Sequence, residues 1–229
     1  FTVLTPEMIR MEWSDSKQFE DRASFIVVNR NLPVPAFTKE VKDGYLYIKT
    51  DKLELKYKEG TYPVTNPAGS ENLKITFDLN GTSVYWHPGK IDPFNLKGTS
   101  RTLDHSSGDN LRGDKEDRLL SRAGWALRDE SKPNSDTSKS LLFENQGGDF
   151  DWVATRKSGN TIDWYFMAYG HDYKKALLDY TKVAGKQPMP PLYSLGYWYS
   201  KYQKYSQQDF MDIVNEIKQH DIPIDVIGL

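Results

Sequence analysis

Side chains able to carry acid–base or metal chemistry are scattered along this sequence of 229 residues. It has no glycine-rich phosphate loop, no histidine pair at metal-ligand spacing and no serine in a nucleophile-elbow context. We expect its four histidines, His87, His105, His171 and His220, to be loop residues that are exposed or locally hydrogen-bonded. The absence of cysteine excludes thiol nucleophiles, cysteine-bound zinc and disulfide scaffolds. The sequence therefore predicts neither a cofactor nor a metal site.

A polar stretch from Gly98 to Asp117 lies within residues 87–121 and has little that could form a core. Long loops in compact domains are usually functional or disordered. We therefore expect a long loop here, held by the regular elements on either side of it.

Most of the chain before residue 170 has the period of two that is typical of strands. The strands expected from this pattern are 8–13, 25–28, 45–50, 53–58, 73–79, 83–86, 123–127, 151–154 and 161–169. Asn80-Gly81 tolerates positive φ and predicts a tight hairpin between 73–79 and 83–86. Regular strands separated by turns predict a mainly β fold, an antiparallel β-sandwich. Trp125 is expected in its core.

A helix and a stiff connector follow the strands. Asp172 is placed to cap a helix that runs to about Ala184, and Gly185 is placed to end it. Three prolines within residues 188–191 form an extended connector that cannot join a sheet interior. The sequence thus predicts two domains, 1–187 with the sandwich and its linking helix, and 188–229.

The last forty residues have the pattern strand, loop, helix, strand. Ser206 and Asp209 form a capping-box pattern, and apolar residues recur at helical spacing from Phe210 to Ile217. The strands expected at 195–199, which includes the core candidate Trp198, and at 224–229 suit a parallel sheet. A lone βαβ unit exposes unpaired edges. We expect missing elements or another copy to cover this tail, as at the start of a truncated α/β domain; a small βαβ cap at a genuine C-terminus is the alternative.

The charge and hydropathy of the sequence limit which classes of partner are expected. Thirty basic and 32 acidic residues give a formal charge of −2 without blocks of like charge, so no nucleic acid or anionic membrane partner is indicated. The sequence contains no apolar run of about 18 residues, so it predicts no membrane span. Six Trp, fourteen Tyr and ten Phe suit sugar stacking, although cores also use aromatics. The charge, hydropathy and aromatic content do not indicate a cellular compartment.

Several segments, taken in order, resemble glycoside hydrolase family 31, the α-glucosidase and α-xylosidase family. They are Arg10-Met11-Glu12-Trp13, Phe19 to Phe25 with Val28-Asn29-Arg30, Gly98 to Asp104, Leu120 to Ala126, and Leu195 to Tyr202. The resemblance implies a galactose-mutarotase-like β-sandwich followed by the first βαβ of a (β/α)8 barrel. It also implies retaining hydrolysis of α-linked oligosaccharides by two aspartates about 5 Å apart. Both belong to later barrel strands, so no catalytic residue is expected within 1–229.

The resemblance also implies three sugar-binding candidates. Tyr202 aligns with a tyrosine that lines the sugar pocket of relatives, beyond the first barrel strand, where barrel active sites form; packing between domains is its alternative role. The family usually has arginine where this chain has Lys201, which cannot make the same forked contact. Arg101 and Asp104 are candidate partners for sugar hydroxyls from the sandwich loop, with a structural ion pair as the alternative.

Two other functions remain open. A non-catalytic carbohydrate-binding sandwich is the main alternative, but it has no use for residues 192–229. A mutarotase-type epimerase needs a histidine and a carboxylate that converge on the anomeric centre, and the scattered histidines do not favour it.

Overall fold

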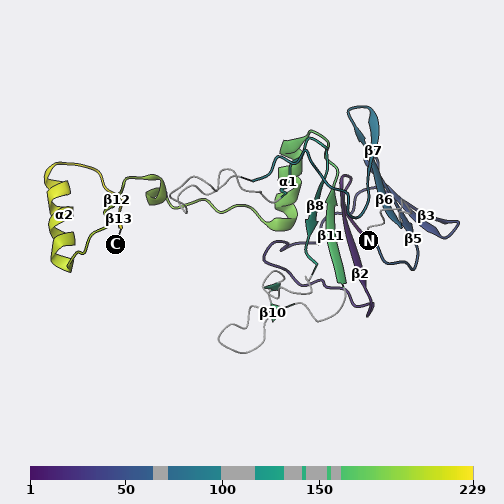
Figure 1. Ribbon diagram of the computed structural model, residues 1–229, viewed down its shortest axis with the longest axis horizontal. Helices are drawn as coiled ribbons and strands as arrows, with labels where there is room; N and C mark the ends of the chain where they lie inside the picture. Colours follow the sequence, from purple (N-terminus) through teal and green to yellow (C-terminus); the bar gives the residue numbers. More distant parts are fainter. Residues whose placement is uncertain (64–71, 99–116, 132–140, 143–153, 156–160, 229) are drawn as a thin grey trace. The chain divides into compact units, whose positions relative to one another are not determined.

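The computed structural model describes residues 1–63, 72–98, 117–131, 141–142, 154–155 and 161–228. It divides into two compact units, Phe1–Lys186 and Gln187–Leu229. The first unit is built mainly of antiparallel sheets, and the second contains a parallel strand pair (Figure 1).

Two antiparallel sheets form the body of the first unit. One has the order β1-β2-β11-β8, with β1 at Thr2–Thr5, β2 at Met8–Ser14, β11 at Thr161–Met167 and β8 at Ala126–Asp129. The other runs in sequence order through β3 (Thr38–Lys42), β4 (Tyr45–Lys49), β5 (Leu53–Lys58), β6 (Leu73–Leu79) and β7 (Thr82–Trp86). A short pair, β9 (Leu141–Leu142) and β10 (Ala154–Thr155), is also present.

The hairpin between β6 and β7 forms as its sequence predicts. Leu79 pairs with Thr82, while Asn80 and Gly81 have φ angles of 55° and 83°. Such positive values suit the tight turn that matches strand twist. The hairpin between β4 and β5 is also confirmed, because Lys49 pairs with Glu54.

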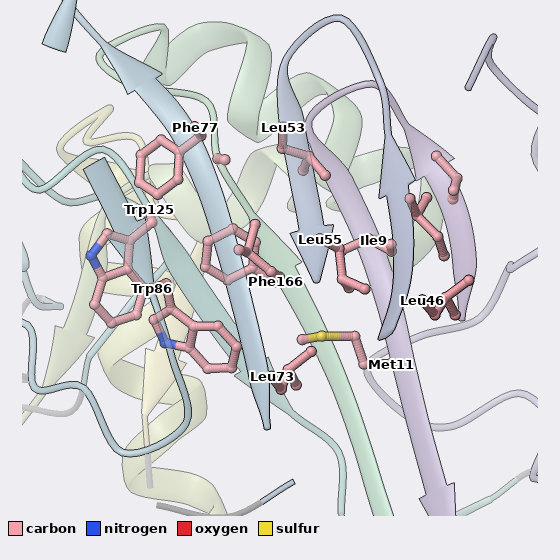
Figure 2. Close-up of a cluster of buried hydrophobic side chains, with 14 residues drawn as sticks. Ile9, Met11, Leu46, Leu53, Leu55, Leu73, Phe77, Trp86, Trp125 and Phe166 are labelled. Atoms are coloured by element: carbon pink, nitrogen blue, oxygen red, sulfur yellow. The ribbon is translucent and has the colours of Figure 1, made fainter. Parts of the chain in front are cut away.

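Both sheets contribute to one hydrophobic core, which Figure 2 shows. From the first sheet come Ile9, Met11 and Phe166, and from the second Leu55 and Ile75, with these five exposed by 2% or less. Alternate residues of each strand point to the other face, as sheet geometry requires. The predicted antiparallel sandwich is therefore confirmed, and Trp125 lies in its core.

The helix α1 (Tyr173–Ala184) covers the other face of the first sheet. Its buried Ala176 and Val183 pack in a second cluster with Met8 and Met167 of that sheet. The predicted cap is confirmed, since the Asp172 side chain accepts a hydrogen bond from the Lys175 amide. This sheet is thus buried on both faces, which explains why β2 has no exposed position.

The second unit is a βαβ arrangement. After the 3₁₀ turn η3 (Leu192–Leu195), β12 (Trp198–Ser200) pairs in parallel with β13 (Val226–Gly228), and α2 (Gln207–Gln219) connects them. The capping box of Ser206 and Asp209 is present, as predicted. The fold class predicted from sequence, an antiparallel sandwich followed by a βαβ unit, is confirmed.

Some predicted strands are wrong. The segment 25–28 is a turn, because the Ser24 hydroxyl accepts hydrogen bonds from the amides of Ile26 and Val27, and the Ser24 amide bonds the Val27 carbonyl. Only Val27 of this apolar run is buried, at 1% exposure. Local side-chain bonding by serine has replaced strand pairing.

Other boundaries shift. Gly124, at φ 77°, lies in a turn closed by its amide on the Ser121 carbonyl, so β8 begins only at Ala126. Leu195 ends a 3₁₀ turn, and β12 begins three residues later. The prediction of Trp198 as a core residue is wrong for this chain, because its side chain is 53% exposed. The sequence pattern also missed β1 and β3.

Among the described helices, none has the length and apolar character needed to cross a bilayer.

Candidate functional site

The carboxyl ends of β12 and β13 lie side by side. Trp198 pairs with Val226, Tyr199 with Ile227 and Ser200 with Gly228, so the chain leaves both strands at the same edge. A side chain at Gly228 would meet the Ser200 hydroxyl at 3.1 Å. In parallel sheets with covering helices, ligands bind beyond this edge. The loop that follows Ser200 is therefore the best-placed candidate in the second unit.

Tyr202 lies in this loop and is fully exposed, and its neighbour Lys201 is also exposed. The loop is tied to its own unit at Tyr205, whose ring lies 4.9 Å from that of Phe210 on α2. Loss of hydration and a hydrogen bond with Tyr199 of β12 raise the pKa of Tyr205. Neither of these contacts involves Tyr202, whose side chain is exposed to solvent.

Acidic residues of this unit lie elsewhere. The Asp225 carboxylate accepts a 2.9 Å hydrogen bond from the Tyr197 amide at the amino end of the pair. Asp209 and Asp212 lie on α2 and contact Ser206 and Gln208 there. Hydrogen bonds from Ser206 lower the pKa of Asp209. Within residues 187–228, the loop 201–205 contributes a lysine–tyrosine surface and no carboxylate.

The other two sequence candidates cannot be placed. Arg101 and Asp104 lie outside the described residues, as does most of the predicted loop. The three candidates are therefore not brought together by the part of the chain that the structure describes, and Tyr202 alone has a described position.

The N-terminal motifs that carry the family resemblance meet in a buried ionic network. Arg10 donates to both oxygens of Asp163 at 2.9 Å and lies 2.8 Å from Glu12. Despite its burial, hydrogen bonding to Asp163 raises the pKa of Arg10, while burial raises the pKa of Glu12. Such residues hold the sandwich together rather than face a ligand.

A second arginine extends this network. Arg30 donates to the Tyr165 hydroxyl at 2.6 Å and to the Arg22 carbonyl at 2.6 Å. Burial raises the pKa of Tyr165 to about 12, which keeps the phenol neutral. Arg22 in turn pairs with Glu20. These contacts fasten the segment 20–30 onto the first sheet, so the motif residues of this segment have a structural role.

The described interior of the sandwich offers little space for a sugar. A cavity of about 50 Å³ is lined by residues that include Glu12, Tyr57 and Trp164, whereas pockets for small molecules usually measure about 300–1,000 Å³. A broader hollow of about 550 Å³ opens beside Phe37 and Thr50.

Histidines provide no catalytic pair in the described part of the chain. His87 contacts the Pro88 carbonyl, and His171 lies between Asn80 and the Arg122 carbonyl. His220 ends α2. His105 lies outside the described residues. Among these described contacts, no histidine pairs with a carboxylate, as the epimerase site considered above would require.

Sequence comparison identifies relatives of this chain. Residues 187–229 match the model of the glycosyl hydrolases family 31 TIM-barrel domain. A segment of 71 residues is 39% identical to alpha-glucosidase 2 of Bacillus thermoamyloliquefaciens, covering 31% of this chain and 9% of that protein. A segment of 73 residues is 36% identical to an alpha-xylosidase of Saccharolobus solfataricus, covering 32% of this chain and 10% of that protein.

Structural comparison shows a similar fold over nearly the whole chain. A family 31 dextranase of Flavobacterium johnsoniae, solved with isomaltotriose, superposes with a TM-score of 0.56 at 19% identity. The match covers 98% of this chain and 30% of the dextranase. At this identity the likeness shows the fold. The sequence resemblance to family 31 is confirmed by the barrel-domain match and by the two curated relatives.

Proposed function

Since this chain is related to the family 31 glycoside hydrolases in sequence and in fold, we propose that it forms the N-terminal part of a retaining α-glycosidase. The proposed activity is hydrolysis of α-linked oligosaccharides, as in an α-glucosidase. The chain spans less than a third of the dextranase and about a tenth of each curated relative aligns with it. The activity is therefore proposed for a longer protein.

One observation supports the proposal most strongly. The segment that matches the family barrel model folds as a parallel strand, a helix and a second parallel strand. This is the repeating unit of a (β/α)8 barrel, whose substrate site lies at the carboxyl ends of its strands. We assign residues 188–229 to the start of that barrel and 1–187 to a flanking sandwich domain.

Within this proposal Tyr202 is a substrate-binding residue. It follows the first barrel strand, and its side chain is fully exposed. A phenol there offers a ring for the apolar face of a sugar and a hydroxyl for hydrogen bonding. Arg101 and Asp104 remain proposed partners for sugar hydroxyls.

Retaining hydrolysis needs two carboxyl groups about 5 Å apart, one as nucleophile and one as acid/base. The described carboxylates of the second unit lie on α2, after it, or at the amino end of β13. We therefore assign both catalytic aspartates to strands beyond this segment.

The test uses the protein encoded by the whole gene. Cleavage of p-nitrophenyl α-glucoside or α-xyloside is followed by proton NMR, which distinguishes the anomers of the released sugar. We expect the α anomer to appear first. Release of the β anomer first contradicts a retaining mechanism. Glycan binding without any turnover favours instead the carbohydrate-binding sandwich.

A further inference from the structure

We infer that the outer face of the five-stranded sheet is a binding surface for an anionic polysaccharide, a polymer with carboxylate-bearing sugar rings. This surface, the tyrosine–lysine face, is defined by residues from four strands and the loop after them: Tyr45, Tyr47, Lys56, Lys74, Tyr85 and Lys90. It goes beyond the proposed hydrolase function, because it belongs to the sandwich.

The strand register places these side chains together. Leu46, Ile48, Leu55 and Ile75 alternate with them and are buried in the core, so the intervening residues occupy the opposite face. Lys56 is the direct partner of Tyr47 on one side and of Lys74 on the other.

The direct pairing of Lys56 with Lys74 is electrostatically unfavourable, because like charges opposite each other destabilise a sheet. The structure separates the two ammonium groups. The Lys56 ammonium lies 4.2 Å from the Tyr45 ring centre, whereas that of Lys74 lies 4.2 Å from the Tyr85 ring centre. An anion above this pair would interact favourably with both lysines.

Cations outnumber carboxylates on the face. The outward positions of its strands hold Lys42, Lys49, Lys56, Lys58 and Lys74 against Glu40, Glu54 and Asp78. Two of these carboxylates are engaged locally, Glu54 with Lys49 at 3.7 Å and Asp78 with the Gly81 amide at 3.0 Å. The excess of positive charge occurs in a chain whose formal charge is −2.

The spacing of the charges favours a polysaccharide over other polyanions. Neighbouring strands lie about 4.8 Å apart and alternate residues about 7 Å apart. Duplex DNA is a denser polyanion, with one charge per about 1.7 Å of its axis when both strands are counted. The carboxylates on the face would also repel a dense polyanion. The tyrosine rings carry lysine ammonium groups, which hinders base stacking, and their hydroxyls offer hydrogen bonds to sugars.

The test is affinity electrophoresis of residues 1–229 in native gels that contain polygalacturonate, with dextran as the neutral polymer. We expect polygalacturonate to retard the chain and dextran to have less effect. The double variant Lys56→Gln/Lys74→Gln should weaken binding about tenfold, the effect of losing two ion pairs between half-buried lysines and the polymer. The variant removes a like-charge pair but also two cation–π contacts, so its melting temperature should change little.

A matched control removes two exposed lysines elsewhere. Lys186→Gln/Lys204→Gln changes the net charge equally, and should retain binding. Equal weakening by both double variants contradicts a localised site. The proposal is also overturned if polygalacturonate does not bind at low salt, if dextran binds equally well, or if single-stranded DNA or anionic phosphatidylserine vesicles bind more tightly through the same lysines.

Discussion

Arg10 and Asp163 meet through two parallel hydrogen bonds of 2.9 Å, from Nε to Oδ1 and from Nη2 to Oδ2, although 153 residues separate them in sequence. Both side chains are only 2% exposed. Arg10 lies on β2 and Asp163 on β11, and these strands pair in the sheet. The two guanidinium nitrogens therefore link strands that are far apart in the sequence. The pair holds β2 against β11, and Arg10 also donates to the Glu20 carbonyl and to Asp21 of the segment 20–30.

Loss of one partner of this pair should be costly. Asp163→Leu leaves the Arg10 charge buried with fewer partners and should lower the free energy of unfolding by about 3 kcal/mol. Urea unfolding followed by tryptophan fluorescence measures the change. Arg10→Met combined with Asp163→Leu should cost less than the sum of the single variants. As a control, Glu54→Gln breaks the exposed pair with Lys49 and should cost less than about 1 kcal/mol.

Asp179 should contribute to stability at neutral pH. Its burial raises the pKa of the carboxyl, but hydrogen bonds from Lys182, Lys175 and Tyr169 outweigh this, and the net pKa is lowered. A lowered pKa stabilises the folded state above the unfolded value of about 3.9. This contribution should be lost as pH falls from about 4 through the folded pKa.

Asp179→Asn tests this dependence by urea unfolding at several pH values. We expect the variant to be less stable than the parent at pH 7 and the difference to shrink in acid. Asp43→Asn is the control, because Asp43 is an exposed turn residue at φ 53°, a conformation that asparagine tolerates. A constant difference between Asp179→Asn and the parent across this pH range contradicts the assignment.

The cap of α2 should determine how firmly its first turn is held. Ser206→Ala removes the acceptor of the Asp209 amide and the hydroxyl that contacts its carboxylate. The helix should lose about 1 kcal/mol. The pKa of Asp209 should rise, since the bonds from Ser206 are what lower it. NMR titration measures the pKa, with Gln207→Ala as a control that should leave it unchanged.

Gly196 should be required at the amino end of the parallel pair. A methyl group there would lie 2.1 Å from the Asp225 Oδ2, the atom that binds the Tyr197 amide. Gly196→Ala should therefore loosen β13 by about 1–3 kcal/mol. Hydrogen exchange at the amides of Asp225 and Val226, which both bond the Tyr197 carbonyl, should become faster.

A second substitution separates this clash from a backbone effect. The φ angle of Gly196 is −89°, which other residues adopt readily. Asp225→Ala in the Gly196→Ala background should thus recover part of the protection. If the double variant exchanges faster than Gly196→Ala, steric conflict with Asp225 is not the cause.

Residues 1–229 alone should not hydrolyse p-nitrophenyl α-glycosides, because the proposed carboxylate pair lies on later strands. Release of p-nitrophenol is measured over a range of pH. Turnover with a carboxylate-dependent profile, lost in Asp225→Asn, would contradict the proposal. The protein from the whole gene is the positive control, and its Tyr202→Phe and Tyr202→Ala variants should raise KM progressively if the tyrosine binds sugar.

The sequence by itself determined the locally encoded elements. Asp172 and Ser206 marked where two helices begin, and Asn80-Gly81 marked the hairpin between β6 and β7. These signals are visible because each acts on backbone groups only a few residues away. The apolar pattern of α2 and its flanking strands was also sufficient to predict a parallel βαβ unit.

Only the tertiary structure decided how distant residues are used. It buried Arg10 against Asp163, left Trp198 exposed and set Lys56 directly opposite Lys74. Hydrophobic period cannot specify partners 153 residues apart, nor which strands become neighbours. The turn at Ser24 shows the same limit on a shorter scale, because a side-chain hydrogen bond there outweighed the strand propensity of the residues that follow.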